Sequence, residues 1–177
     1  MIKPKKSLGQ NFLIDEKVLK KIVECVKIEN NEILEIGPGT GNLTNHILIK
    51  KPKKIYVVEK DSQLSFFLRK KFSNKIIIIN KDILKINENG ISDKKLIVFG
   101  NLPYNISTKI LSKWITNLKD TFWFKQLVLM FQKEVADRII ANYNTSKYGR
   151  LSILSNWKLN IKKIMDIKPY SFFPKPK

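Results

Sequence analysis

Hydrophobic residues gather in five short runs along the chain, and polar or mixed segments separate these runs. Each run is nearly unbroken and rich in β-branched residues, which is typical of strands buried on both faces of a mainly parallel sheet. The runs occupy residues 31–36, 53–58, 75–80, 95–100 and 126–131. We therefore predict five strands of one central sheet.

The segments between these runs carry apolar residues at helical spacing. They cover residues 42–50, 62–72, 107–118 and 133–143. The regular alternation of strand and helix predicts an α/β fold built on a doubly wound sheet.

The two ends of the chain follow other patterns. Residues 16–28 predict an N-terminal helix that Asp15 caps. Near the C-terminus, residues 151–159 are ambiguous, and residues 160–167 predict one more strand. Three prolines between 169 and 177 argue against regular structure in the last segment.

A glycine-rich loop, Gly37-Pro38-Gly39-Thr40-Gly41, follows the first predicted strand. Glycines at such a place let the backbone turn sharply and approach a ligand closely. A dinucleotide-binding fold needs a third glycine at position 42, which is Asn42 here. The loop therefore favours a ligand with an adenosine but no pyrophosphate, and an ordinary turn remains the alternative.

Acidic residues follow the next two predicted strands. Glu59, about 20 residues beyond the glycine loop, is placed to accept hydrogen bonds from ribose hydroxyls. We expect Asp61 to cap the helix that follows it. Asp82 ends the third strand and is a candidate acceptor for an adenine amine, with a solvated loop aspartate as the alternative.

The fourth strand runs into Asn101-Leu102-Pro103-Tyr104. The exocyclic amine of a base is a poor nucleophile, because its lone pair is delocalised into the ring. The Asn101 side-chain oxygen and the Leu102 carbonyl can hold its two hydrogens and stabilise positive charge on the nitrogen. Tyr104 offers a ring on which a flipped-out base can stack. A plain turn with a packed tyrosine is the structural alternative.

Several motifs give the sequence a resemblance to a known family. They read "GQNFL", "EIGPGTGNLT", "VVEKD", "KDIL", "GNLPYNIST", "QKEVADRI" and "YGRLS". The sequence resembles the small-subunit ribosomal RNA adenine dimethyltransferases of the kasugamycin-resistance type. The resemblance implies a class I S-adenosylmethionine-dependent methyltransferase fold, Rossmann-like, without a metal. It also implies transfer of two methyl groups to N6 of each of two adjacent adenosines near the 3′ end of the RNA.

The resemblance also implies roles for individual residues. It assigns Glu59 to the donor's ribose, Asp82 to its adenine, and Phe172 to the face of the target base opposite Tyr104. The residues it assigns to the methyl donor are Asn11, Leu13, Gly37, Glu59, Asp82 and Asn101. A one-position slip would exchange Phe172 with Phe173.

Members of this family continue beyond the last proline motif into a seventh strand and a small helical domain. The sequence ends at Lys177, inside that motif. We therefore expect residues 1–177 to be a catalytic domain that is incomplete at its C-terminus. Its sheet would have an unfilled slot with exposed strand edges.

The composition of the chain indicates what kind of partner it binds and in which cellular compartment it works. The formal charge of +19 and the pI near 10.0 predict a polyanionic partner such as ribosomal RNA. Lysine enrichment from a biased genome is the alternative. Cys25 and His46 are single residues of their kinds, so neither a disulfide nor a metal cluster is expected. No membrane span or signal pattern is present, and we expect a cytoplasmic monomer.

The sequence is also compatible with three other functions. A large-subunit methyltransferase that confers macrolide resistance would share the chemistry and differ in substrate. A non-catalytic RNA-binding or transcription factor could keep the fold, although it would not need "NLPY" together with Gly37, Glu59 and Asp82. An NAD-dependent enzyme is disfavoured by Asn42.

Overall fold

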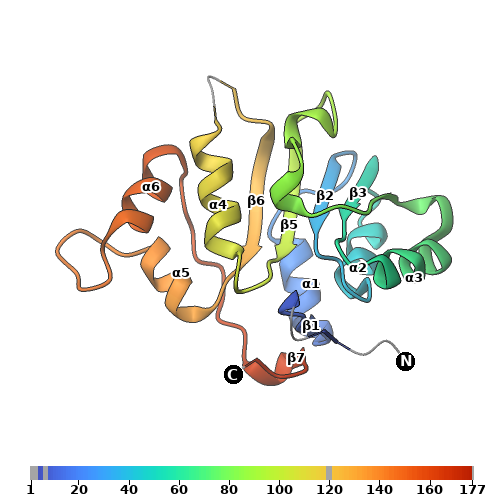
Figure 1. Ribbon diagram of the computed structural model, residues 1–177, viewed down its shortest axis with the longest axis horizontal. Helices are drawn as coiled ribbons and strands as arrows, with labels where there is room; N and C mark the ends of the chain where they lie inside the picture. The colour runs from blue at the N-terminus through green and yellow to red at the C-terminus, as the bar shows by residue number, and fades with distance from the viewer. Residues whose placement is uncertain (1–3, 6–7, 119–120, 177) are drawn as a thin grey trace.

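A computed structural model of the chain describes residues 4–5, 8–118 and 121–176. Its centre is a five-stranded parallel sheet in the order β4-β3-β2-β5-β6 (Figure 1). The strands are β2 (Glu32–Ile36), β3 (Lys54–Val58), β4 (Ile77–Ile79), β5 (Leu96–Asn101) and β6 (Phe124–Met130). All five predicted strands are confirmed, each within two residues of its expected ends.

Helices cover both faces of this sheet. They are α1 (Glu16–Glu24), α2 (Asn42–Ile49), α3 (Ser62–Phe72), α4 (Ser107–Thr116), α5 (Lys133–Ile139) and α6 (Arg150–Lys158). On β2, Ile33 packs into a core cluster with α1, α2 and α3, whereas the next residue, Leu34, packs into a second cluster with α4. Burial on both faces explains why the strand sequences are nearly unbroken apolar runs.

Two aspartates begin helices as the sequence predicts. The Asp15 carboxylate accepts hydrogen bonds from the backbone N–H groups of Lys17 and Val18, at 3.0 and 3.2 Å. The Asp61 carboxylate accepts one from the N–H of Gln63, at 2.9 Å. These bonds satisfy donors that have no partner inside the helix.

The C-terminal third differs from the prediction in two places. Residues 160–167 form no strand: no described strand pairs with this segment, and a strand needs such a partner. The segment instead packs Met165 and Ile167 against the core. The proline-rich end does contain regular structure, a short 3-10 turn (Pro169–Ser171) and β7 (Phe172–Phe173). The ambiguous residues 151–159 lie almost entirely within α6.

Strand β7 pairs antiparallel with β1 (Phe12–Leu13), next to both termini (Figure 1). The backbone N–H of Ile14 also donates to the carbonyl of Ser171 at 2.9 Å, and the Ser171 hydroxyl donates to the Asp15 carboxylate at 2.8 Å. These bonds fix the N-terminal segment beside the carboxyl ends of the parallel strands.

Among the described residues, no helix is long and apolar enough to cross a membrane.

Candidate active site

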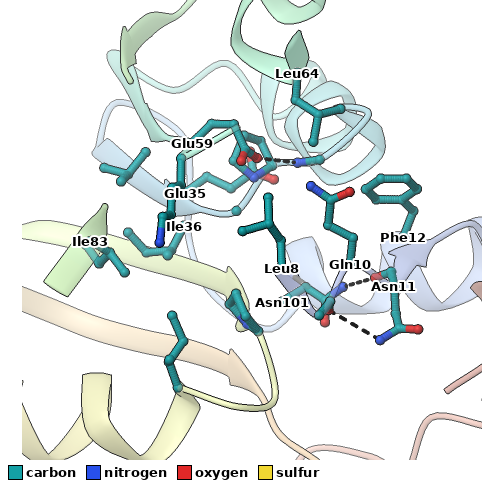
Figure 2. A pocket seen from close by; sticks show the side chains of 18 of the residues that line it. Leu8, Gln10, Asn11, Phe12, Glu35, Ile36, Glu59, Leu64, Ile83 and Asn101 are labelled. Carbon is teal, nitrogen blue, oxygen red and sulfur yellow. Dashed lines mark hydrogen bonds between the residues drawn. The ribbon is translucent and has the colours of Figure 1, made fainter. Parts of the chain in front are cut away.

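A pocket opens at the carboxyl ends of the parallel strands. Its walls come from the loops after β2, β3, β4 and β5, and the N-terminal segment Leu8–Leu13 closes it from one side. In the view of Figure 2, the side chains of Leu8 and Gln10 lie between those of Glu59 and Asn101. The residues that the resemblance assigns to the methyl donor all line this pocket: Asn11, Leu13, Gly37, Glu59, Asp82 and Asn101.

The glycine loop after β2 forms the floor of the pocket with left-handed backbone. Gly37 has φ +64° and Gly39 has φ +57°, a region that side chains rarely adopt. A Cβ atom on Gly39 would lie 2.7 Å from Cδ1 of Phe12 and 2.9 Å from its Cε1. Glycine is therefore needed at position 39 both for the turn and for the close approach of the Phe12 ring.

Glu59 lies at the end of β3 with 6% of its surface exposed. Its Oε1 accepts a hydrogen bond from the N–H of Asp61 at 2.9 Å, and its Oε2 accepts a long one from the N–H of Gly39 at 3.4 Å. Burial raises the pKa of this carboxyl, and the two backbone donors partly oppose that rise. These bonds fix the carboxylate while Oε2 keeps the capacity to accept another hydrogen bond, such as one from a ribose hydroxyl.

Asp82 follows β4 and has a partner on each oxygen. Oδ1 accepts from the N–H of Leu84 at 3.0 Å, and Oδ2 lies 3.1 Å from Nζ of Lys60. Burial alone would raise the pKa of Asp82, but these partners hold it below its ordinary value. Asp82 therefore stays ionised and remains an acceptor at the pocket wall beside Ile83.

Asn101, the last residue of β5, has a defined amide orientation. Its Nδ2 donates to the backbone carbonyl of Asn11 at 2.6 Å (Figure 2). An amide held by its nitrogen directs its oxygen the other way, because the two atoms diverge from one carbon. Within the part of the chain that the structure describes, no protein group donates to this Oδ1. This oxygen therefore has the capacity to accept a hydrogen bond, and its predicted contact with a base amine stays a prediction.

The neighbours of Asn101 occupy different environments. The Leu102 side chain is 1% exposed and packs in the core between β5 and α4. Leu102 is not among the residues that line the pocket, so the role of its carbonyl stays a prediction. Tyr104 is half-buried, and that burial raises the pKa of its hydroxyl. Its neighbours in the chain, Pro103 and Asn105, line the pocket, whereas Tyr104 itself does not line it. The contact of Tyr104 with a base therefore stays a prediction.

The expected stacking surface at Phe172 is not exposed. Phe172 pairs with Leu13 through β7 and β1, and its ring is 6% exposed within the core. The next ring, Phe173, is 56% exposed. Side chains on successive strand residues point to opposite sides, which explains the contrast. A base could stack on Phe172 only if this ring left the core, so the structure gives that prediction no support.

Several residues of the pocket were not expected from the sequence. Leu8, Gln10 and Phe12 line it because the N-terminal segment folds across the strand ends. Glu35 lines it from inside β2, 2% exposed, with its Oε2 accepting from the hydroxyl of Thr44 at 2.6 Å. The one available signal was a second carboxylate, after Glu32, within the strand that precedes the glycine loop. Within the described ranges, no group of three or more His, Cys, Asp or Glu could hold a metal ion.

Comparisons with known proteins agree with this geometry. The family model described as ribosomal RNA adenine dimethylase matches residues 1–177. The Ribosomal RNA small subunit methyltransferase A of Pelagibacter ubique (strain HTCC1062) is 69% identical over 99% of this chain and 67% of its own length. The protein of the same name from Wolbachia sp. subsp. Drosophila simulans (strain wRi) is 46% identical over the whole chain and 65% of its own length.

Two solved structures are also similar. A dimethyladenosine transferase from Plasmodium falciparum has a TM-score of 0.82 at 33% identity, over 94% of this chain and 59% of that one. The 23S rRNA methyltransferase ErmE has a TM-score of 0.74 at 26% identity, over 94% of this chain and 66% of that one. The chain thus spans about two thirds of the length of its curated relatives.

The parallel sheet, the glycine loop after β2 and the pocket at the strand ends define a class I S-adenosylmethionine-dependent methyltransferase fold. The match of the family model over the whole sequence narrows this class. The chain belongs to the ribosomal RNA adenine dimethylase family.

Substitution of Gly39 by alanine is expected to weaken S-adenosylmethionine binding at least about tenfold. The new Cβ would collide with Phe12, and the left-handed backbone of position 39 costs alanine roughly 1–2 kcal/mol. Titration calorimetry with S-adenosylmethionine measures the effect. Gly90→Ala is the matched control, because a Cβ there meets nothing within 4 Å. Equal affinity of Gly39→Ala and the unchanged protein would contradict the close packing of Phe12 on this loop.

Proposed function

We propose that this chain transfers methyl groups from S-adenosylmethionine to N6 of two adjacent adenosines near the 3′ end of small-subunit ribosomal RNA, giving dimethyladenosine. The observation that carries the proposal is the orientation of Asn101. Its amide nitrogen is held by the Asn11 carbonyl at 2.6 Å, so that its oxygen is free to accept a hydrogen bond at the pocket wall.

The residues present fit the methyl donor. The glycine loop lines the pocket with left-handed backbone, and a Cβ on Gly39 would collide with the Phe12 ring, which lines the same pocket. Glu59 would hold the ribose and Asp82 the adenine of the donor. Asn11 and Leu13 would contact it from the N-terminal segment. When bound, S-adenosylmethionine supplies an electrophilic methyl group on its sulfonium.

We expect the N6 amine of the target adenosine to be activated by the groups that hold it in position. Oδ1 of Asn101 and the carbonyl oxygen of Leu102 would each accept one of the two N6 hydrogens. This grip turns the nitrogen lone pair out of conjugation with the ring and toward the methyl donor. The same two oxygens stabilise the positive charge that develops on N6 as the methyl group leaves the donor's sulfur, and N6 then loses one proton to solvent. Tyr104 would stack on the flipped-out base.

The choice of the small-subunit RNA rests on relatedness. The curated relatives at 69% and 46% identity carry the name of a small-subunit methyltransferase, whereas the 23S rRNA methyltransferase shares 26% of this sequence. The charge of +19 supports an RNA partner. This substrate would place the enzyme in the cytoplasm, acting as a monomer on the small subunit or its precursor.

A direct assay separates the candidate substrates. Methyl transfer from labelled S-adenosylmethionine is measured on unmethylated small-subunit particles and, separately, on large-subunit RNA. The proposal predicts label in the small-subunit sample alone. Label in the large-subunit RNA alone would favour a resistance methyltransferase. If the protein binds S-adenosylmethionine and RNA but labels neither sample, the result would favour a non-catalytic RNA-binding protein.

A further inference from the structure

The N-terminal segment that closes the pocket is fastened to the start of helix α3. Nζ of Lys5 lies 2.9 Å from Oδ2 of Asp61, and Nε2 of Gln10 donates to the same oxygen at 3.3 Å. The other end of the Gln10 amide is also engaged, because its Oε1 accepts from the backbone N–H of Lys5 at 2.7 Å. Lys5, Gln10 and Asp61 thus form one connected cluster, which we call the latch.

Asp61 is the buried member of the latch. Its side chain is 3% exposed, whereas that of Lys5 is 42% exposed. Burial alone would raise the pKa of Asp61, but the hydrogen bonds from Lys5, Gln63 and Gln10 hold it below its ordinary value. A buried carboxylate that stays ionised needs hydrogen-bond donors around it, because burying an unpaired charge is costly.

Asp61 is also joined to Glu59, a residue of the pocket wall. Its backbone N–H donates to Oε1 of Glu59 at 2.9 Å, and Glu59 is the candidate for holding the donor's ribose. The side chain of Asp61 therefore holds the segment that closes the pocket, while its backbone holds the carboxylate that faces the ligand.

Two further amides hold the far end of the same segment. Nδ2 of Asn42 donates to the carbonyl of Leu13 at 2.8 Å, and Nδ2 of Asn101 donates to that of Asn11. These amides hold the segment at Asn11 and Leu13, the latch holds it at Gln10, and all three residues line the pocket. The segment is fixed at both ends, and the latch is its attachment on the ribose side.

We propose that Lys5, Gln10 and Asp61 act as positioning residues that hold the N-terminal segment closed over the methyl donor, an inference that rests on the proposed donor site. Loss of the bonds to Asp61 would release the N-terminal segment from the side of the pocket where Glu59 lies. The affinity for S-adenosylmethionine would then fall. The folded core depends little on this attachment, because Leu13, at the far end from the latch, is the member of residues 8–13 that belongs to a core cluster.

Asp61→Asn tests the latch while keeping the helix cap. The asparagine Oδ1 still accepts from the N–H of Gln63, but its Nδ2 faces the donors of Lys5 and Gln10. We expect S-adenosylmethionine to bind about tenfold more weakly, since hydrogen bonds to charged groups are among the stronger ones. Gln10→Glu is a second variant, which places one carboxylate against another and should weaken binding similarly.

Combination of the two changes should restore affinity. In the double variant Gln10→Glu with Asp61→Asn, the amide nitrogen at 61 donates to the carboxylate at 10, and Lys5 keeps a carboxylate partner. A role limited to general stability would not show such a rescue. Asp137→Asn is the matched control, because Asp137 also pairs with a lysine, Lys147, at 2.6 Å, outside the pocket.

Titration calorimetry with S-adenosylmethionine and thermal unfolding are measured on the unchanged protein and all four variants. Weaker binding in both single variants and recovery in the double variant support the latch. Binding that is unchanged in the single variants, or that does not recover in the double variant, overturns it. No binding by the unchanged protein overturns the donor site itself, and the latch with it, so the two failures are distinguishable.

Discussion

Asn101→Ala is expected to lower the rate of methyl transfer at least about 100-fold, the usual cost of removing one preorganised group that stabilises charge in a transition state. The variant loses the Oδ1 acceptor that would grip N6 of the target adenosine. It also loses the bond from Nδ2 to the Asn11 carbonyl, but it leaves the sheet and most of the pocket wall in place. RNA affinity should therefore change little. Single-turnover methyl transfer and RNA binding are measured side by side.

Two companion variants sharpen this result. Asn101→Asp keeps an acceptor oxygen but places its second oxygen against the Asn11 carbonyl, so that we expect an intermediate rate. Asn156→Ala, on the exposed side of α6, should leave the rate unchanged. Methyl transfer by Asn101→Ala at close to the normal rate would show that the N6 amine is positioned by other groups.

Glu35→Gln, measured without ligand, is expected to raise the free energy of unfolding at pH 8 by up to about 3 kcal/mol. Glu35 is buried inside β2, and this burial raises its pKa to about 7 from an ordinary value of 4.5. The bond from the Thr44 hydroxyl lowers the pKa and Glu59 raises it, but desolvation is the largest cause. Glutamine keeps an acceptor for Thr44 and carries no charge to bury.

The sign of this effect follows from proton binding. Between pH 4.5 and about 7, the folded protein holds a proton on Glu35 that the unfolded chain has already released. The stability of the unchanged protein therefore falls as the pH rises through this window, and Glu35→Gln removes that loss. The two proteins should be equally stable near pH 4, and the variant more stable at pH 8. Urea unfolding at both pH values measures the difference.

The exposed carboxyl of Glu29 provides the control for this experiment. Glu29→Gln makes the same chemical change on the surface and should show no such pH-dependent gain. A Glu35→Gln variant that is less stable than the unchanged protein at pH 8 would mean that the buried carboxylate is ionised and held by favourable interactions.

The sequence predicts the sheet well for a physical reason. Strands such as β3 and β5 are buried on both faces, and this burial requires a nearly continuous run of apolar residues. In a parallel sheet the loops after the strands meet at one edge. Residues read from separate loops, such as Gly37, Glu59 and Asn101, were therefore expected to be neighbours, and the structure places them around one pocket.

The features that the sequence does not predict depend on contacts between distant segments. Strands β1 and β7 have two residues each and lie about 160 residues apart, so that neither carries a periodic pattern. The burial of Phe172 follows from this pairing and could not be read locally. The closing of the pocket by Leu8 and Gln10 has the same origin, because Gln10 bonds to Asp61, which lies 51 residues further along the chain.

Nucleoside analysis by mass spectrometry identifies the methylated base and the methylated atom together. Unmethylated small-subunit particles are incubated with this protein and S-adenosylmethionine, and their RNA is digested to nucleosides. We expect N6,N6-dimethyladenosine, formed only when both the protein and the methyl donor are present. Methylation on another base or another atom, with no dimethyladenosine, would contradict the role assigned to Asn101 and its loop.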